Sequence, residues 1–123
     1  MTTMTKRILL AEDEVVLRDF VSRNLRARGF DVLEASNGLE AMAIWEQEHP
    51  HLLILDIMMP RMDGYAFALE LQRRGLRATI PLVVLTADGR ARQKAAQIGA
   101  DGYIEKPFDI LDFLDKVARH IRS

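Results

Sequence analysis

The chain has 123 residues, 49% of them hydrophobic, which is long enough to form one globular domain with a substantial core. Its 17 Lys and Arg residues against 18 Asp and Glu give a net charge of −1, so electrostatics gives no reason to expect binding to nucleic acid or to an anionic membrane. The chain has no cysteine, which excludes disulfides, thiol catalysis and thiolate metal sites.

No apolar run approaches the roughly 18 residues that a membrane-spanning helix needs. The first residues lead directly into a strand of about five apolar positions, too short for the core of a signal peptide. We therefore expect a cytoplasmic protein that does not associate with membranes.

Five apolar runs alternate with helical patterns along the chain. The predicted strands are Arg7–Ala11, Phe30–Ala35, His51–Asp56, Pro81–Thr86 and Gly102–Glu105. The third contains an uninterrupted apolar run without charge, from Leu52 to Leu55, which is typical of a strand buried on both faces of a parallel sheet.

Between the strands, apolar residues recur at the spacings of amphipathic helices. The residues expected on the buried face of the first three helices are Leu17, Phe20, Val21 and Leu25; Gly38, Ala41, Met42 and Trp45; and Phe67, Ala68 and Leu71. The fourth helix, about Arg90 to Ile98, has only a thin apolar face. The buried face expected for the last helix consists of Ile110, Phe113, Leu114, Val117 and Ile121.

The ends of these helices carry recognisable signals. Gly29, Gly75 and Gly99 are placed to end the first, third and fourth helices. Asn37 and Glu40 can form a capping box at the start of the second. Five βα units with right-handed crossovers predict a doubly wound α/β fold, a parallel sheet with helices on both faces. The pattern uses the whole chain, so we expect one domain over 1–123, with an ordered core over about 6–122.

Polar side chains stand where four of the strands end. Glu12 and Asp13 follow the first strand, Asp56 ends the third, Thr86 ends the fourth and Lys106 follows the fifth. Ligands of open α/β sheets bind outside the carboxyl ends of the strands, so these groups are candidates for one site. Three adjacent carboxylates repel one another unless a cation joins them, and an all-oxygen cluster with open positions suits Mg²⁺.

The same residue types suit phosphoryl transfer, in which a protein mainly positions the reactants and neutralises charge. Asp is an established nucleophile that forms an aspartyl phosphate, and Lys106 supplies a compensating point charge. Each residue also has an ordinary structural explanation: Glu12 and Asp13 as charges favoured at a helix N-terminus, Thr86 as a β-branched strand residue and Lys106 as surface charge. Their joint occurrence at four strand ends favours the site.

Four segments carry a family resemblance: Ile8–Glu14, Leu55–Gly64, Leu85–Ala87 and Gly99–Phe108. In this order and spacing, over essentially the whole length, the chain resembles the response-regulator receiver domains of two-component signalling, the chemotaxis-regulator-like family. The resemblance implies a flavodoxin-like (βα)₅ fold with strand order 2-1-3-4-5.

The resemblance also implies roles for individual residues. Asp56 would accept a phosphoryl group from a sensor histidine kinase or a phosphotransfer protein of a phosphorelay. Mg²⁺ would be held by Asp13, Asp56 and the backbone carbonyl of Met58, with Glu12 acting through water. Lys106 would pair first with Asp56 and then with the phosphate.

Three further residues would take part in the conformational change that follows phosphorylation. Thr86 and Ala87 would contact the new phosphate, and Tyr103 would rotate inward behind Thr86, although Tyr103 could also be a half-exposed strand aromatic. The altered surface would be the partner-binding face of the fourth helix, fifth strand and fifth helix. The Lys106–Pro107 peptide bond is expected to be cis by the same similarity.

Two positions near the phosphate vary in this family, and here they are Met58 and Asp88. Met58 cannot orient a water by a hydrogen bond, which predicts an aspartyl phosphate that lives longer than in a Met58→Asn variant. Gly102 stands where receivers attached to winged-helix domains often carry an Asp of their charged dimer face, so we expect a monomer or a weak dimer. The chain ends just after the last helix, so we expect no output domain in it.

Two other function classes fit less well. A phosphatase with an Asp nucleophile would place a general acid–base two residues after Asp56, where this chain has Met58. A binding module that is never phosphorylated would not need the full polar set. We therefore expect a signalling switch rather than an enzyme, acting on a protein partner and not on nucleic acid. His49, His51 and His120 lack metal-ligand spacing and are expected at the surface.

Overall fold

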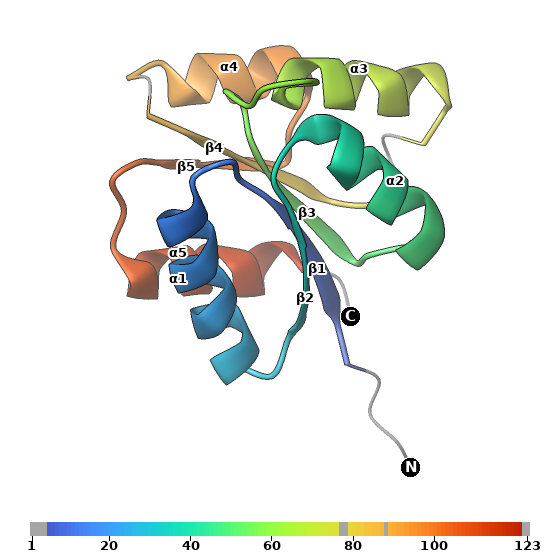
Figure 1. Ribbon diagram of the computed structural model, residues 1–123. Helices are drawn as coiled ribbons and strands as arrows, with labels where there is room; N and C mark the ends of the chain where they lie inside the picture. Colours follow the sequence, from blue (N-terminus) through green and yellow to red (C-terminus); the bar gives the residue numbers. More distant parts are fainter. Residues whose placement is uncertain (1–4, 77–78, 88, 122–123) are drawn as a thin grey trace.

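The computed structural model describes residues 5–76, 79–87 and 89–121. Its centre is a parallel sheet in the order β2-β1-β3-β4-β5, which confirms the predicted doubly wound topology (Figure 1). The strands are β1 (Arg7–Ala11), β2 (Asp31–Ala35), β3 (Leu52–Asp56), β4 (Leu82–Thr86) and β5 (Gly102–Glu105). No helix within the described ranges is long and apolar enough to cross a membrane.

Helices cover both faces of the sheet. They are α1 (Val15–Ala27), α2 (Gly38–Glu48), α3 (Gly64–Arg73), α4 (Ala91–Ile98) and α5 (Ile110–His120). Figure 1 shows α1 and α5 together on one face and α2, α3 and α4 on the other. Every strand lies within one residue of its predicted range, and Gly29, Gly75 and Gly99 follow the ends of α1, α3 and α4 within two residues, the usual uncertainty of helix ends.

The alternation of side chains along each strand divides the interior into two cores. Leu9, Leu53 and Val84 point into the core under α2, α3 and α4, together with the fully buried Phe67. Their neighbours along the strands point to the opposite core, where the fully buried Phe113 of α5 lies. All five residues of β3 are buried, as expected for the central strand of a sheet covered on both faces.

The helix starts follow the capping signals with one difference. Asn37 Oδ1 accepts a hydrogen bond from the Glu40 backbone N–H at 2.8 Å, as predicted. The Glu40 carboxylate accepts from the backbone N–H of Ser36 at 3.1 Å, one residue earlier than a capping box requires. Asp63 caps α3 by accepting from the Ala66 N–H at 2.9 Å.

Two expectations about burial were wrong. Phe20 lies at core spacing in α1, yet it is 47% exposed because the packed face of that helix is formed by Val21 and Leu25. His51 and His120 are half-buried rather than free at the surface, and both hydrogen-bond to the backbone. His49 is exposed, as expected.

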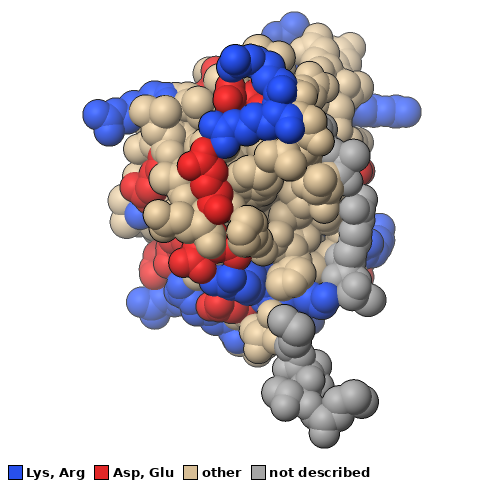
Figure 2. All heavy atoms as spheres, turned by 90° about the vertical axis from the view of Figure 1, so that its right-hand side faces the viewer, with Lys and Arg blue, Asp and Glu red and all other residues tan. Residues whose placement is uncertain are grey.

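Much of the surface charge is locally paired. Arg74 forms ion pairs with Glu70, at 3.0 Å, and with Glu46, which ties α3 to α2. Arg7 pairs with Glu48 and lies 3.6 Å from Asp31. Figure 2 shows acidic and basic side chains interleaved on one side of the molecule. Exposed pairs of this kind contribute little stability individually.

Candidate functional site

The sheet brings the predicted polar residues to one edge. Asp56 is the last residue of β3 and lies opposite Leu85 of β4, and Thr86 lies opposite Glu105 of β5. Because β1 is the other neighbour of β3, Glu12 and Asp13 emerge beside Asp56. We call Glu12, Asp13, Asp56, Thr86 and Lys106 the rim.

Lys106 joins two buried carboxylates. Its ammonium nitrogen lies 2.6 Å from Asp56 Oδ2 and 2.5 Å from Glu12 Oε1. The residues Glu12 and Asp56 are only 1% and 4% exposed. The second oxygen of Asp56, Oδ1, accepts a hydrogen bond from the Met58 N–H at 2.9 Å, so both oxygens of this carboxylate are held in place.

Burial has different consequences for the two sides of this contact. Burial raises the pKa of the Glu12 carboxyl to about 7, and the neighbouring Asp56 acts in the same direction. Burial by itself would lower the pKa of the Lys106 ammonium, but its contacts with Asp56 and Glu12 outweigh burial and raise it. Lys106 is therefore charged at neutral pH, and Glu12 stands near the midpoint of its titration.

The carboxylates of the rim fit a hard cation. Glu12, Asp13 and Asp56 each offer an oxygen, and these oxygens lie within 4.8 Å of one another. Glu12 Oε1 is buried and, apart from its ion pair with Lys106, receives no hydrogen bond within the described part of the chain. Asp13 is exposed, which leaves one side of the cluster open to solvent. An all-oxygen set with an open side suits Mg²⁺ better than a softer metal.

The loop from β3 to α3, which carries Met58, is tightly positioned. Arg61 and Met62 have left-handed φ angles of 63° and 133°. A Cβ on Gly38 of α2 would lie 1.7 Å from the Met62 carbonyl oxygen, so only glycine permits this approach. The sequence placed Gly38 on a buried face but did not reveal this contact, since it depends on a loop distant in sequence.

The residues predicted to take part in the switch differ in burial and in contacts. Thr86 is fully buried at the end of β4, its carbonyl accepting from the Lys106 backbone N–H at 2.8 Å, and Ala87 beyond it is exposed. Tyr103 on β5 is half-buried, with the Lys116 ammonium 5.3 Å from the centre of its ring. The Lys106–Pro107 bond is cis. Asp88 lies outside the described residues.

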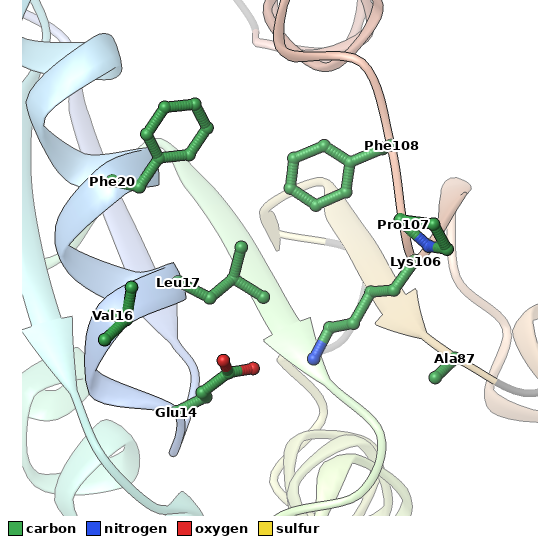
Figure 3. Close-up of a pocket in the computed structure, with 8 residues that line it drawn as sticks. All are labelled: Glu14, Val16, Leu17, Phe20, Ala87, Lys106, Pro107 and Phe108. Atoms are coloured by element: carbon green, nitrogen blue, oxygen red, sulfur yellow. The ribbon is translucent and has the colours of Figure 1, made fainter.

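An apolar groove of about 490 Å³, which sequence reasoning missed, opens beside Lys106. Figure 3 shows Phe20 of α1 and Phe108 facing each other across it, with the Lys106 side chain projecting between the walls. Its lining residues are Glu14, Val16, Leu17, Phe20, Ala87, Lys106, Pro107 and Phe108. The exposure of Phe20 is thus part of a surface feature next to the rim.

A family model described as the response regulator receiver domain matches residues 8–118. The chain belongs to this family. The receiver domain is a signalling switch of two-component systems rather than an enzyme family, and the flavodoxin-like fold agrees with it.

Individual relatives agree with this assignment. The DNA-binding dual master transcriptional regulator RpaA of Synechocystis is 38% identical over 118 residues, which cover 94% of this chain and 49% of RpaA. The probable transcriptional regulator ycf27 of Cyanophora paradoxa is 39% identical over 84% of this chain and 43% of its own length. The chain spans about half the length of the curated relatives it matches.

A solved structure gives the same picture. The chemotaxis response regulator CheY4 of Vibrio cholerae superposes with a TM-score of 0.88 at 27% identity, over 96% of this chain and 100% of CheY4.

Proposed function

We propose that Asp56 is the phosphoacceptor of a two-component phosphorelay and receives its phosphoryl group from the phosphohistidine of a sensor histidine kinase or phosphotransfer protein. The observation that carries this proposal is the ammonium of Lys106 between two buried carboxylates, beside an oxygen cluster that suits a cation. A structural ion pair would not require the third carboxylate, Asp13.

Asp13, Asp56 and the backbone carbonyl of Met58 would hold Mg²⁺, with Glu12 acting through water. When bound, the ion neutralises charge on the phosphoryl oxygens. The close approach of Gly38 to the Met62 carbonyl restrains the β3–α3 loop, in which Met58 lies, and this restraint supports the assignment.

The residues of the chain perform the transfer mainly by positioning. An Asp56 carboxylate oxygen attacks phosphorus, a P–O bond forms, and the P–N bond to the donor histidine breaks. The electron pair of that bond remains on the imidazole nitrogen. Lys106 holds Oδ2 and the Met58 N–H holds Oδ1 before the reaction, and afterwards the Lys106 ammonium compensates the phosphate charge.

The donor would dock on the apolar groove. The groove is open beside Lys106, and Val16 and Phe20 on its α1 wall are 76% and 47% exposed. Exposed apolar surface of this kind marks contact sites for other proteins. A helix of the donor with an apolar face would cover Phe20 and bring its histidine to the rim.

Phosphorylation would alter the face made by α4, β5 and α5. Thr86 and Ala87 would contact the phosphate, and Tyr103 would move inward as Thr86 shifts. Tyr103 is half-buried, so an inward movement would bury its ring further. The phosphate would supply the strong acceptors that favour this arrangement. We propose that 1–123 acts as one receiver domain, monomeric or weakly dimeric, that signals through protein contacts.

The proposal is tested by measuring the mass of the chain after incubation with acetyl phosphate and Mg²⁺. The intact chain and the control variant Asp31→Asn, which changes an exposed acid remote from the rim, should each gain one phosphoryl group. Asp56→Ala should gain none. An unchanged mass for the intact chain would instead identify a binding module that is not phosphorylated, whereas repeated turnover of an aryl phosphate would identify a phosphatase.

A further inference from the structure

The loop between β1 and α1, which carries two carboxylates of the rim, is held by a side chain that reaches back from α1. Arg18 lies at the end of the first turn of this helix, and its Nη1 donates a hydrogen bond to the backbone carbonyl of Glu12 at 2.8 Å. This carbonyl belongs to the peptide group that joins Glu12 to Asp13. Arg18 therefore restrains the orientation of that peptide group.

The start of α1 offers few other contacts that could fix this loop. Glu14 is the N-cap residue of α1, and its side chain makes no capping hydrogen bond. The Glu12 carboxylate restrains the loop through Oε2, which accepts a hydrogen bond from the Glu14 N–H at 3.1 Å. Asp13 is exposed, and its carboxylate forms no hydrogen bond or ion pair with any residue that the structure describes. The direction of the Asp13 side chain thus depends on the backbone that Arg18 contacts.

Arg18 is itself ordered by a contact with β2. Its Nε lies 3.6 Å from Glu34 Oε1. The Arg18 side chain is 19% exposed, whereas the side chains of Arg23 and Arg26 on the same helix are 76% and 48% exposed. A long side chain that is already ordered in the free protein loses little conformational entropy when a ligand binds beside it. Arg18 is therefore pre-organised for its contact with the loop.

Arg26 provides a comparison on the same helix. Its Nη2 donates a hydrogen bond to the Val32 carbonyl at 3.1 Å and lies 3.1 Å from Glu34 Oε2. Arg26 thus makes the same two kinds of contact as Arg18, one to a backbone carbonyl and one to Glu34. The two arginines differ in which backbone they hold, because Arg26 contacts β2 and Arg18 contacts the loop of the rim.

We propose that Arg18 is a positioning residue for the magnesium site of the rim. By holding the Glu12–Asp13 peptide group, it directs the Asp13 carboxylate towards Glu12 and Asp56, whose ligand oxygens lie within 4.8 Å of that of Asp13. Contacts that orient the ligands of a metal increase its affinity. The inference rests on the proposed function, since it requires that the rim binds Mg²⁺.

The charge of Arg18 gives the expected effect a distinctive sign. A guanidinium near a cation site repels Mg²⁺, so the loss of this charge alone would strengthen Mg²⁺ binding. The loss of the hydrogen bond to Glu12 would weaken Mg²⁺ binding, because the Asp13 carboxylate would no longer be held in one direction. Weaker binding by a variant without Arg18 would therefore identify the hydrogen bond as the larger of the two effects.

The test is a calorimetric titration of the full chain, freed of metal, with MgCl₂ and without a phosphoryl donor. Arg18→Met keeps most of the apolar stem and should weaken Mg²⁺ binding about three- to tenfold, less than the loss of a group bonded directly to a ligand side chain. Arg18→Lys, which keeps the charge and a donor, should recover part of this loss. The matched control is Arg26→Met, which should leave the Mg²⁺ affinity unchanged.

Two further measurements distinguish positioning from a contribution to stability alone. Arg18→Met and Arg26→Met should lower the midpoint of urea unfolding by similar amounts, so that only the Mg²⁺ affinity separates them. In an Asp13→Asn background, Arg18→Met should not weaken Mg²⁺ binding further, because the hydrogen bond acts through the Asp13 carboxylate. Unchanged or tighter binding by Arg18→Met, an equal loss in Arg26→Met, or additive effects of Arg18→Met and Asp13→Asn would overturn the proposal.

The outcome for Arg18 can be separated from that for Asp56. If the Arg18 variants bind Mg²⁺ as expected but acetyl phosphate adds no phosphoryl group to the chain, the positioning role stands and the phosphoacceptor proposal fails. If the chain is phosphorylated and Arg18→Met binds Mg²⁺ as the wild type does, the phosphoacceptor proposal holds and the positioning role fails. If the wild type binds no Mg²⁺, both the positioning role and the magnesium site proposed for the rim are wrong.

Discussion

The interior of the sheet and its carboxyl rim are built from opposite kinds of side chain. Along β1, β3 and β4 the buried residues are apolar up to the strand ends, where Glu12, Asp56 and Thr86 follow in similarly buried positions. Ser22 of α1 is the other buried polar residue in the described part of the chain. Burial of an apolar side chain stabilises the fold, whereas burial of a carboxylate costs free energy unless it is paired. Packing of the apolar interior thus offsets the free-energy cost of the buried charges at the rim.

The largest effect on stability is expected in the interior. Phe113→Ala removes a fully buried ring from the core under α1 and α5 and should lower the free energy of unfolding by about 3–5 kcal/mol. The matched control is Phe20→Ala, which removes an exposed ring of the same type and should lower it by about 1 kcal/mol or less. Urea titrations measure both values, and similar losses for the two variants would contradict the distinction between a packed face and an exposed groove.

A change at the rim should cost nearly as much, for a different reason. Lys106→Met keeps most of the side-chain volume but leaves Glu12 and Asp56 buried without their shared cation. We expect the free energy of unfolding to fall by about 2–4 kcal/mol in the presence of a chelator. Mg²⁺ should restore part of this loss, since it also neutralises the carboxylates.

The control for Lys106→Met is Lys6→Met, which changes a lysine that forms no ion pair with any residue in the described ranges and should have little effect. If Mg²⁺ fails to stabilise the Lys106→Met variant, the carboxylates of the rim do not jointly bind the ion.

A change at the rim should alter how the free energy of unfolding depends on pH, whereas a change in the interior should not. The pKa of Glu12 is raised to about 7 in the fold, above its ordinary value of 4.5. Its contribution to the free energy of unfolding is therefore fully present below pH 4.5, where Glu12 is protonated in both the folded and the unfolded state. The contribution is lost as the pH rises through 7. Relative to Glu12→Gln, which does not titrate, the metal-free wild type should lose about 3 kcal/mol between pH 4.5 and 8.

Urea titrations of both proteins with chelator, at several pH values, measure this difference. Phe113→Ala is the reference, because a change in the apolar interior should shift stability equally at every pH. Parallel curves for the wild type and Glu12→Gln would show that the Glu12 carboxyl titrates normally.

Most of the fold could be predicted from the sequence because its determinants are local. The apolar run Leu52–Leu55 indicated a central strand, and the helical spacings identified the buried faces of α2, α3 and α5. The rim followed from topology, since parallel strands bring their carboxyl ends to one edge.

Features that depend on contacts between distant segments could not be predicted. Helical spacing placed Phe20 with Val21 and Leu25, but only the position of α1 on the sheet decides which of them is covered. The approach of Gly38 to Met62 and the packing of His120 on Gly102 each join elements far apart in sequence, and a lone glycine or histidine gives no sign of its partner. The apolar groove beside Lys106 was missed for the same reason, because it lies between elements.

The smallest effect on stability should accompany a clear effect on function. Met58 follows Asp56 by two residues and is 66% exposed, so Met58→Asn should change the free energy of unfolding by less than about 0.5 kcal/mol. An asparagine amide can orient a water for attack on the aspartyl phosphate, which a thioether cannot do. The variant should therefore lose its phosphoryl group several-fold faster than the wild type, as followed by mass measurement after removal of acetyl phosphate. Met58→Leu, which is equally unable to position water, should match the wild type. Equal rates for all three proteins would show that the side chain at this position, beside the rim, does not control the lifetime of the phosphate.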